Sequence, residues 1–194
     1  LEQKMSKALP MIFAGNLVRE FNISVGIDYK TVVQEVFNEL KNYQNENTGG
    51  FYIWPEKQYQ FYVSPYLSVN VLYMMYMAKK LGYKIDEKVY NLAIKYAKDF
   101  IAKRASKQNE PYTDDYYTGC YVTALYVLAE LNSADESYID SIYRKLSNMP
   151  VYVKATMVKA LIKLNRTKYK EMITGLISEM MNRLKYEGDY AYFT

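Results

Sequence analysis

Apolar residues recur along this chain at the spacing of an α-helix, from its first residues almost to its last. The pattern breaks where a capping residue, a proline or a glycine interrupts it, as at Ser64-Pro65 and at Gly82. Pro10 lies inside the first helical pattern and should kink it or loosen one turn. The pattern predicts eight helices, which cover residues 2–21, 29–43, 64–81, a stretch from 86, 114–131, a stretch from 135, 150–164 and 167–184.

The predicted helices are of two alternating kinds. The third, fifth and seventh are apolar on nearly every side and should be enclosed, whereas the second, fourth, sixth and eighth are amphipathic and should lie outside. Helix pairs with one inner and one outer member build a two-layered array. We therefore expect an all-α fold of about four helix pairs. The irregular spacing of the pairs favours a closed or curved α/α barrel over a strict solenoid, and eight helices cannot share one four-helix-bundle core.

A glycine-aromatic loop separates the second and third predicted helices, and it contains Gly49, Gly50, Phe51, Trp54 and Pro55. Phe51 and Trp54 are candidates for an aromatic sugar platform, but such residues more often plug the end of a helix layer. The two glycines are not a phosphate-binding loop, because the required lysine and the strand–helix context are missing.

Composition narrows the classes of function. The chain has 194 residues, half of them hydrophobic, which is enough for one domain with a real core. It has 25 basic and 21 acidic side chains, so its net charge of +4 is small and well mixed, and we expect no nucleic-acid partner. It has no histidine and one cysteine, which excludes a histidine general base, the usual zinc sites and an internal disulfide within this sequence. We expect no cofactor and no metal.

The residues with candidate catalytic chemistry lie in or near the fifth predicted helix. Asp114 and Asp115 begin the helix, with Glu110 just before it, and paired carboxylates are the machinery of glycoside hydrolases. The commoner role of such aspartates is to cap the helix and to interact with its dipole. Cys120 lies further along among apolar residues, so we expect a buried structural thiol rather than a nucleophile.

Three short motifs, which together extend over the whole chain, carry a family resemblance. They are Leu1-Glu2-Gln3 followed by a helix, Gly49-Gly50-Phe51 through Trp54-Pro55 with Ser64-Pro65-Tyr66-Leu67 and Gly82-Tyr83, and Gly188-Asp189-Tyr190-Ala191-Tyr192. They resemble three motifs in the thioester domain of bacterial alpha-2-macroglobulin-like proteins, which are relatives of complement. The family motifs are C-x-E-Q, of which this sequence begins at the second position, G-G-F…W-P…P-Y-L-T-A…G-Y and G-D-T-A-Y. The resemblance implies an α/α toroid of six helix hairpins. Residues 1–194 would be a single domain of this type, truncated at both ends.

The resemblance also implies a chemistry. In this family a cysteine thiol condenses with a glutamine side chain to give an internal thioester. Carried over, Gln3, with Glu2 beside it, would be the acyl partner, and the cysteine would be the residue immediately before Leu1, which this sequence does not contain. Cys120 cannot substitute for it, because it is distant in sequence and lies inside a helix. The chain as cut should therefore be inert, and it should not be an enzyme.

Some complement relatives use a histidine near the start of a later inner helix to relay the acyl group. The comparable region here holds Tyr116 and Tyr117, which would then shield the thioester. Without a histidine, direct attack by lysine amines is the natural preference of the parent protein.

The resemblance implies partners and a location as well. The partners would be the proteases that the full-length protein traps and the other domains of the parent chain, and the location would be the periplasm or cell envelope. Self-association of the fragment is also expected, because an open ring exposes inner-helix faces. Two alternatives stay open: an α/α-barrel glycan hydrolase or lyase that uses Asp114 or Asp115, and a helical-repeat binding module without thioester chemistry.

Overall fold

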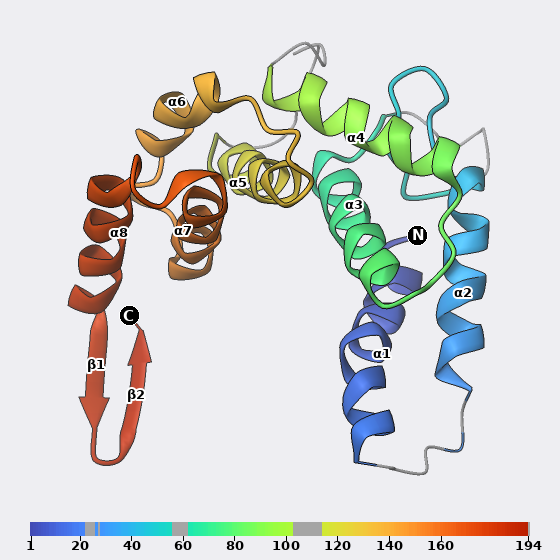
Figure 1. Ribbon diagram of the computed structural model, residues 1–194, viewed down its shortest axis with the longest axis horizontal. Coiled ribbons are helices and arrows are strands. Elements are labelled where there is room, and N and C mark those ends of the chain that lie inside the picture. The colour runs from blue at the N-terminus through green and yellow to red at the C-terminus, as the bar shows by residue number, and fades with distance from the viewer. Residues whose placement is uncertain (22–25, 27, 56–61, 103–113, 194) are drawn as a thin grey trace. The chain divides into compact units, whose positions relative to one another are not determined.

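The structure is a computed structural model, and it describes residues 1–21, 26, 28–55, 62–102 and 114–193 (Figure 1). Within these residues the fold is all-α apart from one two-stranded sheet, which confirms the predicted fold class. The backbone forms two compact units, Leu1–Phe100 and Ile101–Thr194, and each is described by itself. The toroid and the single domain stay predictions.

The first unit contains four α-helices and a short 3-10 turn. They are α1 (Glu2–Glu20), α2 (Tyr29–Glu39), η1 (Leu40–Asn42), α3 (Pro65–Lys80) and α4 (Glu87–Ile101). Helix α1 packs against both α2 and α3 (Figure 1). It continues through Pro10 without a break in the helix, and the predicted kink stays a prediction.

The starts of these helices follow the capping residues in the sequence. The Asp28 carboxylate accepts a hydrogen bond of 3.2 Å from the backbone nitrogen of Thr31, and Ser64 caps α3 with Pro65 in the first turn. The Asp86 carboxylate accepts a bond of 3.1 Å from the backbone nitrogen of Val89 in α4. Because these signals are local, the predicted boundaries are confirmed to within a few residues.

Helix α3 provides most of the core of this unit. It is buried on most of its sides, and its buried residues are Leu67, Ser68, Val69, Val71, Leu72, Met74, Met75, Tyr76 and Ala78. Helix α4 buries only one stripe, which consists of Val89, Tyr90, Ala93, Tyr96, Ala97, Phe100 and Ile101. The predicted difference between an enclosed third helix and an amphipathic fourth helix is therefore confirmed.

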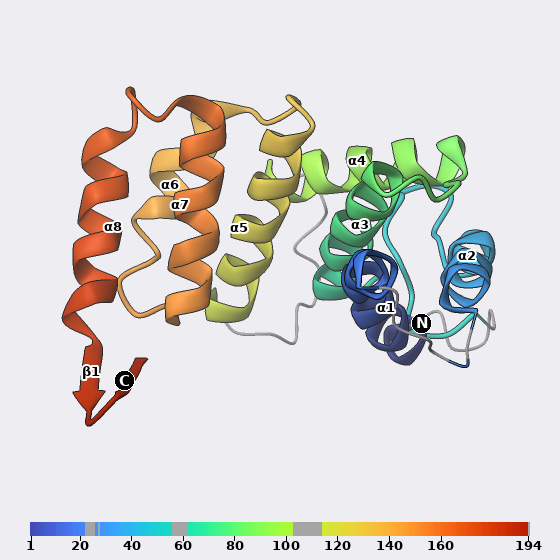
Figure 2. The same cartoon turned by 60° about the horizontal axis from the view of Figure 1, so that its bottom comes forward.

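The second unit contains α5 (Asp114–Glu130), η3 (Glu136–Tyr138), α6 (Ile139–Tyr143), α7 (Val151–Asn165) and α8 (Lys170–Asn182). Helix α7 packs against α5 on one side and against α8 on the other (Figure 2). Helix α5 is enclosed as predicted, but α7 is enclosed only in part, because Tyr152 and Ile162 are exposed.

The chain then forms an antiparallel hairpin of β1 (Leu184–Glu187) and β2 (Tyr190–Phe193), with Leu184 opposite Phe193. The prediction that residue 184 belongs to the eighth helix was wrong, because α8 ends at Asn182. Strand β1 contains Tyr186, and strand β2 alternates tyrosine with other side chains. A two-residue Gly188-Asp189 turn joins the strands, and Gly188 has a φ of +58°. A Gly-Asp pair between two such runs is a hairpin signal that outweighs the apolar periodicity.

No helix in the described part of the chain combines the length and the apolar character needed to cross a membrane.

Candidate functional site

The first turn of α1 has a buried side and an exposed side. Leu1 and Met5 are buried in the first unit, as are Ala8 and Ile12 further along the helix. Glu2 and Gln3 are exposed and, together with Ser6 and Lys7, line an open hollow on the surface. The side-chain amide of Gln3 therefore lies where a reacting group from outside the unit could reach it.

The glycine-aromatic loop holds the start of this helix. The terminal ammonium of Leu1 donates a hydrogen bond of 2.7 Å to the backbone carbonyl of Ile53, although the two residues are 52 positions apart. An ion pair between Lys4 and Glu39 also ties the first turns of α1 to the end of α2. The loop is thus bonded to Leu1, two residues before Gln3, and the role of Gln3 as a site residue stays a prediction.

Two glycines let this loop lie directly on α4. Gly49 has a φ of +83°, and a Cβ atom built on it would lie 2.0 Å from the backbone oxygen of Leu92. A Cβ atom on Gly50 would lie 2.3 Å from Val63 and 2.6 Å from the ring of Tyr96. Neither position has room for a side chain, which explains the glycine pair by packing and not by ligand binding.

The two aromatic residues of the loop have opposite environments. Phe51 is 0% exposed, and its backbone nitrogen donates a bond of 2.7 Å to the hydroxyl of Ser68 in α3. Trp54 is 57% exposed. The predicted plug is therefore Phe51 alone, and a sugar platform that uses Phe51 is excluded because its ring is completely covered. Pro55, which follows Trp54, is half-buried.

Of the carboxylates proposed for glycan chemistry, the structure describes the side chain of Asp115 only. Asp115 is exposed in the first turn of α5, Glu110 lies outside the described residues, and so does the environment of the Asp114 side chain. In the described ranges, no group of three or more His, Cys, Asp and Glu side chains could hold a metal ion.

Cys120 is buried in α5, and burial raises the pKa of its thiol to about 12. The thiol is therefore protonated at neutral pH and is a poor nucleophile. This confirms the prediction of a structural thiol.

Tyr116 and Tyr117 pack ring against ring near the start of α5. Their ring centroids are 5.4 Å apart at an interplanar angle of 88°, and Tyr117 is buried. The rings of Tyr117 and Tyr121 follow at 6.5 Å. Because these tyrosines belong to the second unit and Gln3 belongs to the first, their role as a shield stays a prediction.

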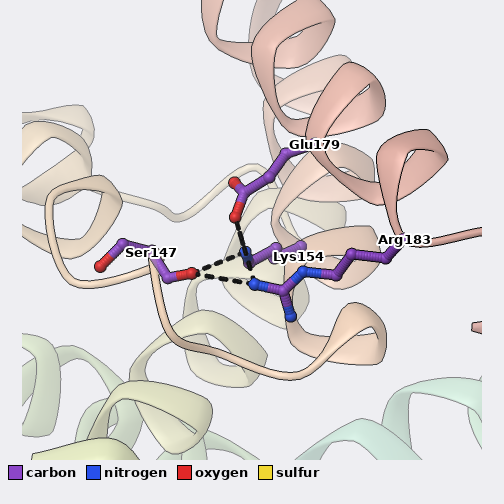
Figure 3. A network of polar contacts seen from close by, with 4 residues as sticks. All are labelled: Ser147, Lys154, Glu179 and Arg183. Atoms are coloured by element: carbon purple, nitrogen blue, oxygen red, sulfur yellow. Dashed lines mark hydrogen bonds and ion pairs between the residues drawn. The ribbon is translucent and has the colours of Figure 1, made fainter. Parts of the chain in front are cut away.

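One polar cluster was not predicted. Lys154 of α7 has a side chain that is 0% exposed, and its ammonium donates a bond of 2.9 Å to the backbone carbonyl of Ser147 and pairs with Glu179 of α8 (Figure 3). Arg183 contacts the same two partners, at 3.3 Å and 3.5 Å. The signal in the sequence is a lysine in an apolar helix, followed by a Glu and an Arg spaced i, i+4 at the end of a later helix. The cluster is satisfied internally and joins α7 to α8.

Solved structures of bacterial alpha-2-macroglobulins match this chain over most of its length. The chain has the fold of an alpha-2-macroglobulin segment. Native Escherichia coli alpha-2-macroglobulin, spanning domain MG7 to the C-terminus, matches with a TM-score of 0.75 and 18% identity, over 91% of this chain and 28% of that chain. Salmonella alpha-2-macroglobulin reacted with methylamine matches with a TM-score of 0.77 and 16% identity, over 97% and 12% of the two chains. The trypsin-activated Escherichia coli protein matches with a TM-score of 0.76 and 18% identity, over 91% and 12%.

This chain thus spans 12% to 28% of the length of the alpha-2-macroglobulin chains named above. No protein-family model and no curated protein sequence matches it. At these identities the likeness shows the alpha-2-macroglobulin fold, and the chemistry has to be argued from the residues.

Proposed function

We propose that this chain is part of the thioester domain of a bacterial alpha-2-macroglobulin-like protease inhibitor, with Gln3 as the acyl partner of a cysteine immediately before Leu1 in the full-length protein. The observation that carries the proposal is the place of Gln3, exposed in the first turn of α1 in a chain with the alpha-2-macroglobulin fold. Residues three apart lie on one face of a helical turn, so a thiol at that preceding position could reach the Gln3 carboxamide.

The chemistry needs no cofactor. The cysteine sulfur attacks the side-chain carbonyl carbon of Gln3, the carbon–sulfur bond forms, the carbon–nitrogen bond breaks, and the thiol proton leaves with the nitrogen as ammonia. An amine or hydroxyl of a trapped protease then attacks the same carbon, which forms an amide or ester and returns the thiol. Reaction with methylamine and activation by trypsin or elastase, known for the matched proteins, support this sequence of steps.

The proposal extends to the surroundings of the site. The chain is a non-enzymatic part of one α/α-toroid domain. Its partners are the trapped proteases and the other domains of the parent chain, and its location is the periplasm or cell envelope. Tyr116 and Tyr117 shield the thioester from water in the complete domain. The fold likeness and the sequence motifs support these statements.

A glycan hydrolase or lyase is disfavoured. The matched structures are alpha-2-macroglobulins, and the described residues form no group of three or more His, Cys, Asp and Glu side chains that could hold a metal ion. Two carboxyl groups facing each other across a cleft are the minimum for glycoside hydrolysis. The test that follows distinguishes the proposed function from a binding module of the same fold without thioester chemistry.

Intact-protein mass spectrometry tests the proposal. A longer chain that begins before the proposed cysteine should be lighter than its sequence mass by one ammonia, and it should gain one methylamine on incubation. The same chain with Gln3→Glu should show neither change. The 194-residue chain should not take up methylamine, because its Gln3 is an ordinary amide. A longer chain with its full sequence mass would contradict the thioester, and the binding module would then be the function that remains.

A further inference from the structure

We propose that Gln44 is a positioning residue for the thioester. Its side-chain amide fixes the 49–55 loop, and the Ile53 carbonyl of that loop fixes the turn that carries Gln3. The inference rests on the proposed function and adds to it a residue that none of the three sequence motifs contains.

A hydrogen bond from the Leu1 nitrogen to the Ile53 carbonyl links the loop to the helix start. The first nitrogens of a helix have no partner within the helix, and the nitrogen of Leu1 finds one in the Ile53 carbonyl at 2.7 Å. When a residue precedes Leu1, this nitrogen belongs to the peptide bond that joins the proposed cysteine to the helix. A peptide N–H directed at the same carbonyl would let the loop hold the bond next to the reacting thiol.

Gln44 ties the loop to α4. Its side-chain nitrogen donates a bond of 2.9 Å to the backbone carbonyl of Gly49 and a second bond of 2.9 Å to the carbonyl of Val89. The Gln44 side chain is buried, so both carbonyls would lose this donor inside the protein if it were removed. The Gln44 amide thus bonds Gly49 to α4, in addition to the close packing of Gly49 on Leu92.

The segment between Gln44 and Ile53 is held along its whole length. The nitrogen of Asn45 donates to the carbonyl of Gly50 at 2.8 Å, and the nitrogen of Tyr52 donates to the carbonyl of Tyr43 at 2.8 Å. The carbonyl of Phe51, two residues before Ile53, accepts from the nitrogen of Ser64 at 2.9 Å. A shift of the loop near Gly49 is therefore passed on to Ile53, and from there to Leu1.

Greater mobility of the turn that carries Gln3 should shorten the lifetime of the thioester. Water can attack the Gln3 carbonyl more often when the turn moves, and the sulfur and the carbonyl carbon spend less time in contact. Loss of the Gln44 amide should therefore speed the loss of the thioester without touching either reacting group.

The test compares two glutamines in the full-length protein. Gln44→Met removes the donor and keeps the length of the side chain. Gln34→Met is the matched control, because the Gln34 amide donates to the carbonyl of Lys84 at 2.7 Å and so ties α2 to the segment before α4 instead. The readouts are hydrogen exchange of the peptide that contains the Leu1 nitrogen and the rate of thioester loss in water, both by mass spectrometry.

We expect Gln44→Met to raise both rates by about tenfold and Gln34→Met to leave both nearly unchanged. Equal rates of thioester loss in the two variants would overturn the inference. If the unsubstituted protein lacks the mass deficit of a thioester, the proposed function fails. The exchange rates alone then decide whether Gln44 holds the Leu1 turn, and equal exchange in the two variants overturns that link.

A second pair of variants serves if Gln44→Met does not fold. Leu1→Pro removes the donated hydrogen at a helical position where proline is accommodated, and Leu1→Val keeps that hydrogen while trimming the side chain. Faster thioester loss in Leu1→Pro than in Leu1→Val is expected, and equal rates in the two would contradict the role of the Ile53 carbonyl.

Discussion

Lys154 of α7 and Glu179 of α8 form an ion pair in which the lysine side chain is completely buried and the glutamate is partly exposed. Arg183 contacts the same glutamate and also the carbonyl of Ser147, which is the other partner of the lysine. The two members of the pair are therefore not equivalent. Without the lysine, its partners keep Arg183, whereas without the glutamate a buried ammonium loses its counter-charge.

This asymmetry predicts which substitution harms the second unit more. Glu179→Gln should lower the free energy of unfolding by about 2 kcal/mol, and Lys154→Met should lower it by less than about 1 kcal/mol, because a buried unpaired charge costs more than an apolar replacement. Urea unfolding of the 194-residue chain measures both. Glu171→Gln, an exposed acid in the first turn of α8, is the control and should be close to neutral. A larger cost for Lys154→Met would contradict the prediction.

Gly49 and Gly82 isolate the effect of close packing on the loop. Both have a positive φ, +83° and +84°, so alanine is strained at each by a similar amount. Only Gly49 also meets the backbone of Leu92, whereas nothing lies within 4 Å of a Cβ atom on Gly82. Gly49→Ala should therefore cost about 2 kcal/mol more than Gly82→Ala in urea unfolding. Equal costs would show that the loop can move off α4.

Cys120 should make the protein less stable at high pH. Burial raises the pKa of its thiol to about 12 from an ordinary value of 9.0, so the unfolded chain loses this proton first as the pH rises. The stabilisation is complete below about pH 9 and is lost as the pH approaches about 12, at about 1.4 kcal/mol per pH unit.

The Cys120→Ala variant should not show this decline between about pH 9 and pH 10. The comparison belongs in that window, because burial also raises the pKa of Tyr90, from 10.0 to about 12, and its effect begins at higher pH. Urea unfolding with a reductant present measures the slope. The same slope in both proteins would mean that the thiol titrates normally in the folded state.

Local signals made most of the helices predictable. Ser64-Pro65 and Asp28 mark helix starts through bonds that span a few residues, and such bonds are visible in a sequence. The end of α8 was mispredicted because Leu184 continues the apolar spacing of that helix, while the turn at Gly188 decides in favour of strands. The helical spacing of apolar residues and the turn preference of Gly188 make opposite predictions there, and the backbone follows the turn.

The candidate site was predictable only in part. The resemblance located Gln3, but the bond between Leu1 and Ile53 joins residues 52 positions apart, and no periodic pattern reports such a contact. Exposure of Trp54 and burial of Lys154 likewise depend on which helices pack together. Side chains of these types usually lie in the opposite environment, so residue type alone points the wrong way.

The hairpin predicts where self-association of the 194-residue chain would occur. Tyr186 and Tyr190 are 74% and 79% exposed, and they lie on opposite faces of the sheet because Tyr186 is opposite Ala191 and side chains alternate along a strand. A two-stranded sheet with aromatic side chains open to water on both faces is only marginally stable alone and gains by pairing. Tyr186→Thr with Tyr190→Thr keeps β-propensity and should shift the sedimentation coefficient at high concentration toward that of a monomer. Tyr62→Thr, an exposed tyrosine of the first unit, should not; an equal shift would place the contact elsewhere.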